Sequence, residues 1–297
     1  MRDDIARLKR EKKAIILAHN YQRPEVQAVA DVVGDSLELS VQAKNTDAEI
    51  IVFCGVDFMA ETAKILNPAR KVLLPVKDAT CPLAHMLTPE DLLAARREHP
   101  EAAIVVYINS TAACKAVADV VCTSANAVRV VEALNKREVI FGPDANLAAY
   151  VQARVPNTRL IPVPPHGYCY VHTGFTLQDV DEARQKGTTI ICHPECNIDV
   201  QQASDYIAST GGMVQKALLH RSWSVLTEKE MAHRLRTLFP DRTFIAKDGA
   251  ICHEMKKTRL SDVYRSLLHE EYEVILPEDL MHRARGAIER MIAIGRG

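Results

Sequence analysis

Three cysteines recur at nearly equal intervals along the chain. Cys81 and Cys169 are 88 residues apart, and Cys169 and Cys252 are 83 residues apart. Each follows a short apolar run and a loop, and each precedes an expected helix. Cysteine thiolates hold iron–sulfur clusters, and a [4Fe–4S] cluster with only three cysteine ligands keeps one iron open for a substrate. The spacing therefore predicts a catalytic [4Fe–4S] cluster at these three cysteines.

Two other interpretations of these cysteines stay open at this point. Intracellular cysteines are often simply buried small apolar residues, and zinc is a competing metal, although cysteine pairs spaced C-x₂-C are absent from the sequence. The remaining cysteines are interpreted as core or turn residues; they are Cys54, Cys114, Cys122, Cys192 and Cys196.

Ionisable side chains follow the first apolar run of each repeat. His19 and His193 occupy equivalent positions 174 residues apart. Tyr21 and Glu195 each lie two residues further along, and we predict that they act as general acid and base. The candidates at these positions, together with one histidine near the second cysteine, are His19, Tyr21, Tyr107, Asn109, His172, His193 and Glu195.

Small polar residues open the next helix in each repeat, as Asp35-Ser36, Thr123-Ser124 and Ser209-Thr210. A hydroxyl at such a place often only caps the helix. Three of them aimed at one cavity would instead form an anion site of hydroxyls and backbone N–H groups. We therefore expect a small ligand with several negative charges, such as phosphate or carboxylates.

The repeats are also visible as matching segments. Ala30-Asp31-Val32-Val33, Ala118-Asp119-Val120-Val121 and Ser204-Asp205-Tyr206-Ile207 place their aspartates 88 and 86 residues apart. Each repeat contains three short apolar runs that alternate with amphipathic helices, a pattern typical of parallel strands in α/β proteins. The expected helices at the starts of the repeats and at the end of the chain cover residues 3–12, 89–99, 177–186, 260–270 and 277–294.

These patterns predict an α/β protein of three similar three-layer units with parallel sheets, arranged with pseudo-threefold symmetry around a central cavity. The expected domains are residues 1–83, 84–171 and 172–255, with helices in 256–297 closing onto the first domain. Ligands of parallel α/β sheets bind beyond the carboxyl ends of the strands, which is where all the candidate side chains lie. The alternative is three stacked units without a shared centre.

Composition limits the classes of partner. The 297 residues carry 37 Lys and Arg against 38 Asp and Glu, so the net charge is −1 and predicts no binding to nucleic acid. No apolar run approaches the roughly 18 residues of a membrane span, and the start of the chain lacks a signal-peptide core. We therefore expect a cytoplasmic protein, in which eight cysteines are not a disulfide framework.

Taken together, the motifs resemble the quinolinate synthase family over essentially the whole chain. The matching segments are Ile16-Leu17-Ala18-His19-Asn20-Tyr21-Gln22, Gly34-Asp35-Ser36-Leu37, Phe58-Met59-Ala60-Glu61, Ala79-Thr80-Cys81-Pro82, Tyr107-Ile108-Asn109-Ser110, Cys122-Thr123-Ser124-Ala125-Asn126-Ala127, His193-Pro194-Glu195-Cys196 and Met255-Lys256-Lys257. The resemblance implies three α/β domains and a [4Fe–4S] cluster held by Cys81, Cys169 and Cys252. It also implies condensation of iminoaspartate with dihydroxyacetone phosphate to quinolinate, phosphate and water, in de novo NAD biosynthesis. A functional link to an iminoaspartate-producing enzyme is expected.

The resemblance assigns roles to the candidate residues. The implied substrate-binding residues are His19, Asp35, Ser36, Tyr107, Asn109, Ser124, His172, His193, Glu195 and Thr210. Among them, the hydroxyls would hold carboxylates or phosphate and the histidines would orient oxygens. Tyr21 and Glu195 would move protons with help from Tyr107, while the open iron acts as a Lewis acid.

The chain departs from the family in two places, and two other classes of protein stay open. It has no cysteine after Cys252, so the C-terminal C-x₂-C-x₂-C cluster of some members does not carry over, and Cys169 lies between two tyrosines where some members have His-Cys-Pro. The other classes are a different cluster-dependent hydro-lyase acting on a small hydroxy acid, and a non-enzymatic metal-binding protein.

Overall fold

The computed structural model describes residues 1–295. Within them, strands pair into three four-stranded sheets, one in each of three consecutive units, and every pair of neighbouring strands is parallel. The strands are the short apolar runs of the sequence; in β3 (Ile50–Cys54), for example, all residues are buried. The predicted α/β architecture of three similar parallel units is confirmed.

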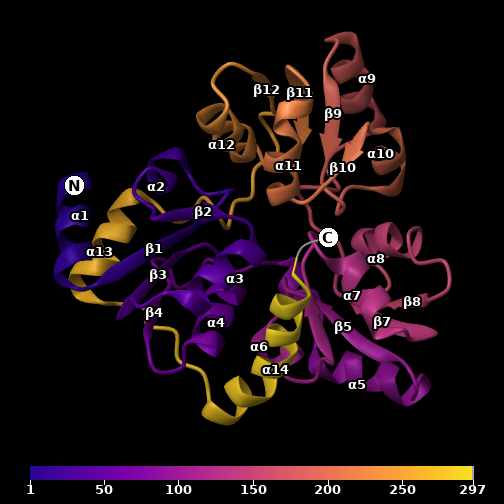
Figure 1. Cartoon of the computed structure of the whole chain (residues 1–297), viewed down its shortest axis with the longest axis horizontal. Helices are drawn as coiled ribbons and strands as arrows, with labels where there is room; N and C mark the ends of the chain where they lie inside the picture. The colour runs from indigo at the N-terminus through magenta and orange to yellow at the C-terminus, as the bar shows by residue number, and fades with distance from the viewer. Residues whose placement is uncertain (296–297) are drawn as a thin grey trace.

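The three units appear as three lobes around a common centre (Figure 1). The first unit contains α1 (Arg2–Glu11), β1 (Ala14–His19), α2 (Pro24–Gln27), β2 (Val32–Gly34), α3 (Ser36–Asn45), β3, α4 (Asp57–Leu66) and β4 (Lys71–Leu73). The second contains a 3₁₀ turn (Leu83–Met86), α5 (Pro89–Glu98), β5 (Ala103–Tyr107), α6 (Ala112–Lys115), β6 (Val120–Cys122), α7 (Ala127–Leu134), β7 (Glu138–Gly142), α8 (Ala145–Gln152) and β8 (Arg159–Pro162). The third contains α9 (Leu177–Gln185), β9 (Thr189–Cys192), α10 (Ile198–Ala203), β10 (Tyr206–Ile207), α11 (Thr210–Lys216), a 3₁₀ turn (Ala217–Leu219), β11 (Ser222–Leu226), α12 (Glu230–Leu238) and β12 (Thr243–Ile245).

The sheets share one topology. Strand order is β2-β1-β3-β4 in the first unit and follows the same pattern in the other two, so the first long strand always lies inside the sheet. The sequence indicated three strands per unit, and the structure adds a short edge strand to each: β2, β6 and β10. These edge strands contain only two or three residues, too few to show a periodic pattern.

The repeated aspartates connect each edge strand to its neighbour. Asp31 accepts a hydrogen bond from the backbone N–H of Ile16 (2.8 Å), and Asp119 and Asp205 accept equivalent bonds from residues 104 and 190 (both 2.7 Å). The donor lies 15 residues before the aspartate each time. The spacing of the sequence repeat therefore reflects one structural contact made three times.

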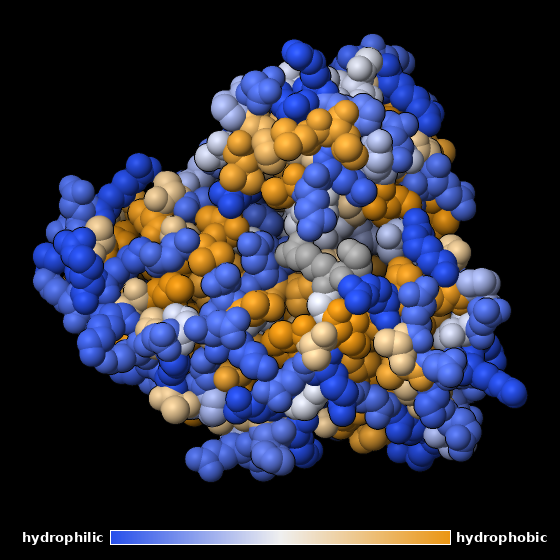
Figure 2. Space-filling view, in the orientation of Figure 1, coloured by the Kyte–Doolittle hydropathy of each residue, from blue (hydrophilic) through white to orange (hydrophobic). Residues whose placement is uncertain are grey.

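The units pack on one another through a shared core. One cluster of buried residues includes Phe58, Phe141 and Trp223 from the first, second and third units. Stacked units without a common centre would not build such a cluster. Hydrophilic residues cover most of the rim of the molecule (Figure 2).

Two helices follow the third unit. α13 (Leu260–His269) packs against α1, α2 and β3 of the first unit, whereas α14 (Glu278–Ile294) contacts α6, α7 and β6 of the second unit as well as α3 and α4 of the first (Figure 1). The chain thus returns to its beginning and joins the first two units. Among the described residues, no helix combines the length and apolar character needed to cross a membrane.

Candidate active site

A central cavity of about 70 Å³ lies where the carboxyl ends of the strands from the three units meet. β1 and β5 end at His19 and Tyr107, and β9 ends one residue before His193. The lining contains all the site residues predicted from the sequence: His19, Tyr21, Asp35, Ser36, Cys81, Tyr107, Asn109, Ser124, Cys169, His172, His193, Glu195, Thr210 and Cys252. The structure therefore brings the whole predicted set to one place.

A side chain from the following short helix holds the turn after each first strand. In the first unit Gln27 donates to the backbone oxygens of Asn20 (3.0 Å) and Gln22 (2.9 Å), and in the third Gln201 does the same for Pro194 and Cys196 (both 2.8 Å). Lys115 takes this place in the second unit. Its fully buried ammonium group donates to the carbonyl of Ser110 (2.7 Å). These contacts fix the turns that carry the candidate catalytic residues.

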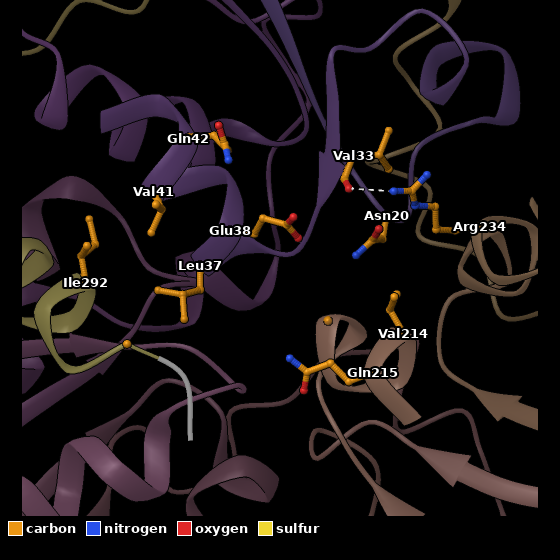
Figure 3. Close-up of a pocket in the computed structure, with 12 residues that line it drawn as sticks. Asn20, Val33, Leu37, Glu38, Val41, Gln42, Val214, Gln215, Arg234 and Ile292 are labelled. Atoms are coloured by element: carbon orange, nitrogen blue, oxygen red, sulfur yellow. Dashed lines mark hydrogen bonds between the residues drawn. The ribbon is translucent and has the colours of Figure 1, made fainter. Parts of the chain in front are cut away.

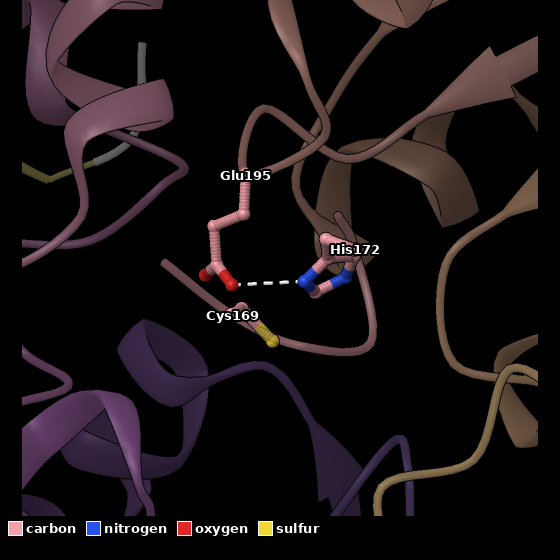
Figure 4. A group of neighbouring side chains, drawn as sticks. All are labelled: Cys169, His172 and Glu195. Carbon is pink, nitrogen blue, oxygen red and sulfur yellow. Dashed lines mark hydrogen bonds and ion pairs between the residues drawn. The ribbon is translucent and has the colours of Figure 1, made fainter. Parts of the chain in front are cut away.

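Glu195 is the centre of a hydrogen-bonded group, of which Figure 4 shows the bond to His172. Tyr107 donates its hydroxyl to Glu195 Oε1 (2.5 Å), and His172 Nδ1 lies 2.8 Å from Oε2. Burial alone would raise the pKa of Glu195, but His172, His193 and the hydrogen bonds from His172 and Tyr107 lower the pKa below its usual value. Glu195 is thus held as a carboxylate that accepts hydrogen bonds from both neighbours.

Tyr21 approaches the same group from the first unit. Its hydroxyl oxygen lies 2.6 Å from Thr227 Oγ1 and 3.4 Å from His172 Nε2, and Thr227 Oγ1 is 2.8 Å from that nitrogen. Burial and the nearby Glu195 raise the pKa of Tyr21 and of Tyr107, so both phenols keep their protons at neutral pH. Tyr21 therefore reaches Glu195 through His172 and Thr227.

Thr227 is a site residue that the sequence did not indicate. It is fully buried and directly follows β11. Thr227 directly precedes Glu228, whose equivalents in the first and second units are Asp57 and Asp144. The residues that precede these two are Val56 and Pro143. Neither has a hydroxyl, so comparing the repeats gave no signal. Only its place at the carboxyl end of a strand could have marked it.

His19 and His193 have the same local geometry. In each, Nδ1 accepts the backbone N–H of the residue two positions later, Tyr21 (3.2 Å) or Glu195 (3.3 Å). Burial, with Lys256 near His19 and His172 near His193, lowers the pKa of each histidine to about 3. Both rings are therefore neutral at neutral pH and carry their proton on Nε2, which leaves Nε2 as the donor of each ring.

The N-cap positions of the three helices are occupied by Asp35, Asn126 and Ser209, and not by Ser36, Ser124 and Thr210. Asp35 caps α3 by accepting the N–H of Glu38 (2.9 Å), and Ser209 caps α11 by accepting the N–H of Gly212 (3.1 Å). Asn126 stands at the start of α7. Capping therefore does not explain why Ser36, Ser124 and Thr210 face the cavity.

The three predicted cysteine ligands also line the cavity, and they differ from the other cysteines. They are partly accessible, whereas the five others are buried and are absent from the lining. Burial raises the pKa of Cys81, Cys169 and Cys252, and the negative charge that a neighbouring thiolate would carry adds to this shift for the first two.

Each cysteine loop is fixed by an acidic residue of its own unit. The backbone N–H of Cys81 donates to Asp57 (3.2 Å), and that of Cys252 donates to Glu228 (3.4 Å). The carboxyl group of Asp144 lies at the equivalent place in the second unit and faces the backbone N–H of Cys169. The acid precedes its cysteine by 24 or 25 residues each time, a regularity that the sequence contained but that was not recognised. The donor set and its threefold support fit an iron–sulfur cluster.

A tighter group of possible metal ligands lies at one side of the cavity. Among the described residues, one ligand atom each from Cys169, His172 and Glu195 lie within 4.8 Å of one another (Figure 4). A mononuclear metal could bind here. The hydrogen bond between His172 and Glu195, however, already occupies one nitrogen and one carboxylate oxygen of this group.

An outer groove of about 480 Å³ lies between the first and third units (Figure 3). Arg234 and Glu38 line it, together with apolar residues such as Leu37 and Val214. Asn20, which lines the groove, donates from Nδ2 to Oγ1 of Thr210, which lines the central cavity (3.0 Å). The groove contains none of the predicted catalytic residues, all of which line the smaller central cavity.

The sequence was also compared with known proteins. A family model described as Quinolinate synthetase A protein matches residues 3–293. Curated relatives named quinolinate synthase include proteins of Thermococcus onnurineus strain NA1 (54% identical, covering 97% of this chain and 96% of the relative) and Pyrococcus abyssi (52% identical, covering 98% of each). The Thermotoga maritima protein of the same name is 46% identical and covers 99% of each chain.

Proposed function

Because the chain belongs to the quinolinate synthetase A family, we propose that it condenses iminoaspartate with dihydroxyacetone phosphate to give quinolinate, phosphate and water. The observation that carries this proposal is the central cavity, in which three cysteines, three hydroxyls and the Tyr107–Glu195–His172 group face one another. Such a cavity suits two small anions that must be joined and dehydrated.

The proposed cofactor is a [4Fe–4S] cluster bound by Cys81, Cys169 and Cys252. When bound, its iron without a cysteine ligand supplies a Lewis acid for an oxygen atom of the substrate. This assignment is supported by the partial accessibility of these three thiols and by the acid that holds each loop. We prefer it to a mononuclear metal at Cys169, His172 and Glu195, because two of those side chains already bond to each other.

The protein's own residues would bind the substrates and move protons. We propose that Ser36, Ser124 and Thr210 donate hydrogen bonds to carboxylate or phosphate oxygens. His19 and His193 would donate from Nε2 to carbonyl or carboxylate oxygens, and Asp35 and Asn109 would complete the binding surface. These groups come from all three units, so bound substrate would draw the units together.

Proton transfers are assigned to the residues around Glu195. As a carboxylate, Glu195 is suited to take a proton from carbon or nitrogen, and Tyr21, whose phenol stays protonated, is suited to give one to a leaving oxygen. Tyr107 shares its proton with Glu195 and would assist an isomerisation of the three-carbon substrate. Burial of these side chains excludes water from the reacting atoms.

A second candidate function is a cluster-dependent hydro-lyase acting on a small hydroxy acid, because the same open iron and acid–base residues would serve it. Substrate omission separates the two. Protein with an anaerobically assembled cluster should form quinolinate only when both iminoaspartate and dihydroxyacetone phosphate are present. Loss of water from a hydroxy acid, without a need for dihydroxyacetone phosphate, would support the hydro-lyase. Because iminoaspartate is unstable, we further propose that an enzyme producing it acts together with this protein.

A further inference from the structure

We propose that Thr227 is a positioning residue of the reaction: its hydroxyl directs the Tyr21 hydroxyl and holds the His172 ring at Nε2. This inference rests on the function proposed above. It starts from a buried hydroxyl with two polar neighbours, Tyr21 Oη at 2.6 Å and His172 Nε2 at 2.8 Å. Thr227 is fully buried, so solvent does not compete for these bonds.

The direction of each hydrogen bond follows from Glu195. A carboxylate can only accept, so His172 Nδ1, at 2.8 Å from Glu195 Oε2, carries a proton. With the Nδ1 proton directed at Glu195, Nε2 faces the Thr227 hydroxyl as the acceptor of its proton. The Thr227 oxygen is left to accept the hydrogen bond that Tyr21 donates. A single threonine thus fixes the orientation of two candidate catalytic groups.

Tyr21 belongs to the first unit, and the residues that hold it belong mainly to the third. Lys256 donates to the backbone carbonyl of Tyr21 and forms an ion pair with the buried carboxylate of Glu228 (2.8 Å). Glu228 is the residue after Thr227. Two consecutive residues at the end of β11 therefore hold Tyr21, one at its hydroxyl and one, through Lys256, at its main chain. Such restraint aims the phenol at the cavity.

Three variants test this role. Thr227→Val removes the hydroxyl with little change in shape, and Thr227→Ser keeps the hydroxyl. Thr188→Val is the matched control, because Thr188 is a buried threonine of the same unit whose hydroxyl bonds to Ser224 Oγ (2.7 Å), and it does not line the cavity. The measurement is single-turnover quinolinate formation under anaerobic conditions with the cluster assembled.

We expect Thr227→Val to lower the rate by about tenfold or more, and Thr227→Ser and Thr188→Val to stay within about threefold of the unmodified protein. In a Tyr21→Phe protein, Thr227→Val should lower the rate by a smaller factor than it does in the unmodified protein, because one of the two groups that Thr227 orients is gone. A Thr227→Val rate equal to that of the unmodified protein, or equal losses with and without the Tyr21 hydroxyl, would overturn the proposal.

Crystal structures of the two Thr227 variants provide a readout that does not depend on the reaction. In Thr227→Val the Tyr21 hydroxyl or the His172 ring should leave the position seen here, and in Thr227→Ser both should keep it. Rings that stay in place in Thr227→Val overturn the proposal. If the unmodified protein with its cluster forms no quinolinate, the proposed function fails, and these structures still decide whether Thr227 positions the two rings.

Discussion

The hydroxyl of Tyr107 donates a 2.5 Å hydrogen bond to Glu195, a residue 88 positions further along the chain and in the next unit. Tyr107 ends β5 of the second unit, and Glu195 follows β9 of the third. Tyr21 then reaches the same carboxylate from the first unit through Thr227 and His172. The proposed acid–base group therefore exists only where the three units meet.

Replacing the proposed acid or base should separate binding from chemistry. We expect Tyr21→Phe and Glu195→Gln to keep the cluster and to bind quinolinate, but to lower single-turnover quinolinate formation by roughly 10²-fold or more. In the double variant the rate should fall by a factor much smaller than the product of the two single factors, because the residues belong to one hydrogen-bonded group. Tyr206→Phe is the control, since its hydroxyl bonds to His220 (2.9 Å) away from the cavity. Near-normal rates in both single variants would leave Tyr107 and the histidines as the candidates.

Cluster assembly should depend on three of the eight cysteines. Cys81→Ala, Cys169→Ala or Cys252→Ala should each abolish the bound iron and sulfide and the visible absorption band, because two thiolates hold a cluster poorly. Cys54→Ala and Cys114→Ala should retain both signals, since these thiols are buried away from the cavity. A cluster that survives Cys169→Ala but is lost in Cys192→Ala or Cys196→Ala would disprove the ligand assignment.

The three hydroxyls should contribute to the binding of anions. Ser36→Ala, Ser124→Ala and Thr210→Ala should each weaken quinolinate binding by about 1–3 kcal/mol, the usual cost of a lost hydrogen bond to a charged group. Ser40→Ala is a matched control one turn further along α3, where the hydroxyl donates to the backbone oxygen of Ser36 (2.7 Å) and does not line the cavity. Isothermal titration under anaerobic conditions gives the affinities. Unchanged affinity in all three variants would exclude an anion-binding role.

His19 should make the fold sensitive to acid. Burial and Lys256 lower its pKa to about 3 in the folded protein, whereas the unfolded chain binds the proton near pH 6.5. The resulting stability is complete above the unfolded pKa and is lost as pH falls toward the folded pKa. Between about pH 7 and pH 5.5, His19 should account for a decrease of about 1 kcal/mol in the free energy of unfolding.

Urea unfolding of unmodified protein and of His19→Gln, prepared in the same cluster state, measures this contribution. The free energy of unfolding should fall less for His19→Gln over this pH range. Equal decreases for the two proteins would show that the His19 ring is not held neutral by its surroundings.

The repeats made most of this site predictable. Equal spacing identified Cys81, Cys169 and Cys252, and the ends of apolar runs identified His19, Tyr107 and His193, because parallel strands of similar units end at a common place. The ends of strands and helices depend mainly on neighbouring residues, so one sequence is enough to predict them. The helix from Pro89 to Glu98 was predicted to within one residue, since Thr88 and Asp91 cap it.

Contacts between units were not predictable from one sequence. Thr227 has no counterpart with a hydroxyl in the other repeats, and its importance depends on a tyrosine 206 residues away. Lys256 belongs to one of the segments that match the family, but nothing in the sequence indicates its ion pair with Glu228. The edge strands β2, β6 and β10 were also missed, because they depend on the pairing that Asp31 and its equivalents support and not on a pattern of their own.

Single-turnover stoichiometry tests the central claim most directly. Protein with an anaerobically assembled cluster would be mixed with iminoaspartate and dihydroxyacetone phosphate, and quinolinate and phosphate would be counted against bound cluster, with the cluster-free Cys81→Ala protein in parallel. We predict equal amounts of quinolinate and phosphate from the unmodified protein, and neither product above background from Cys81→Ala. Cluster-loaded protein that forms no quinolinate, or a cluster-free variant that forms as much, would contradict the claim.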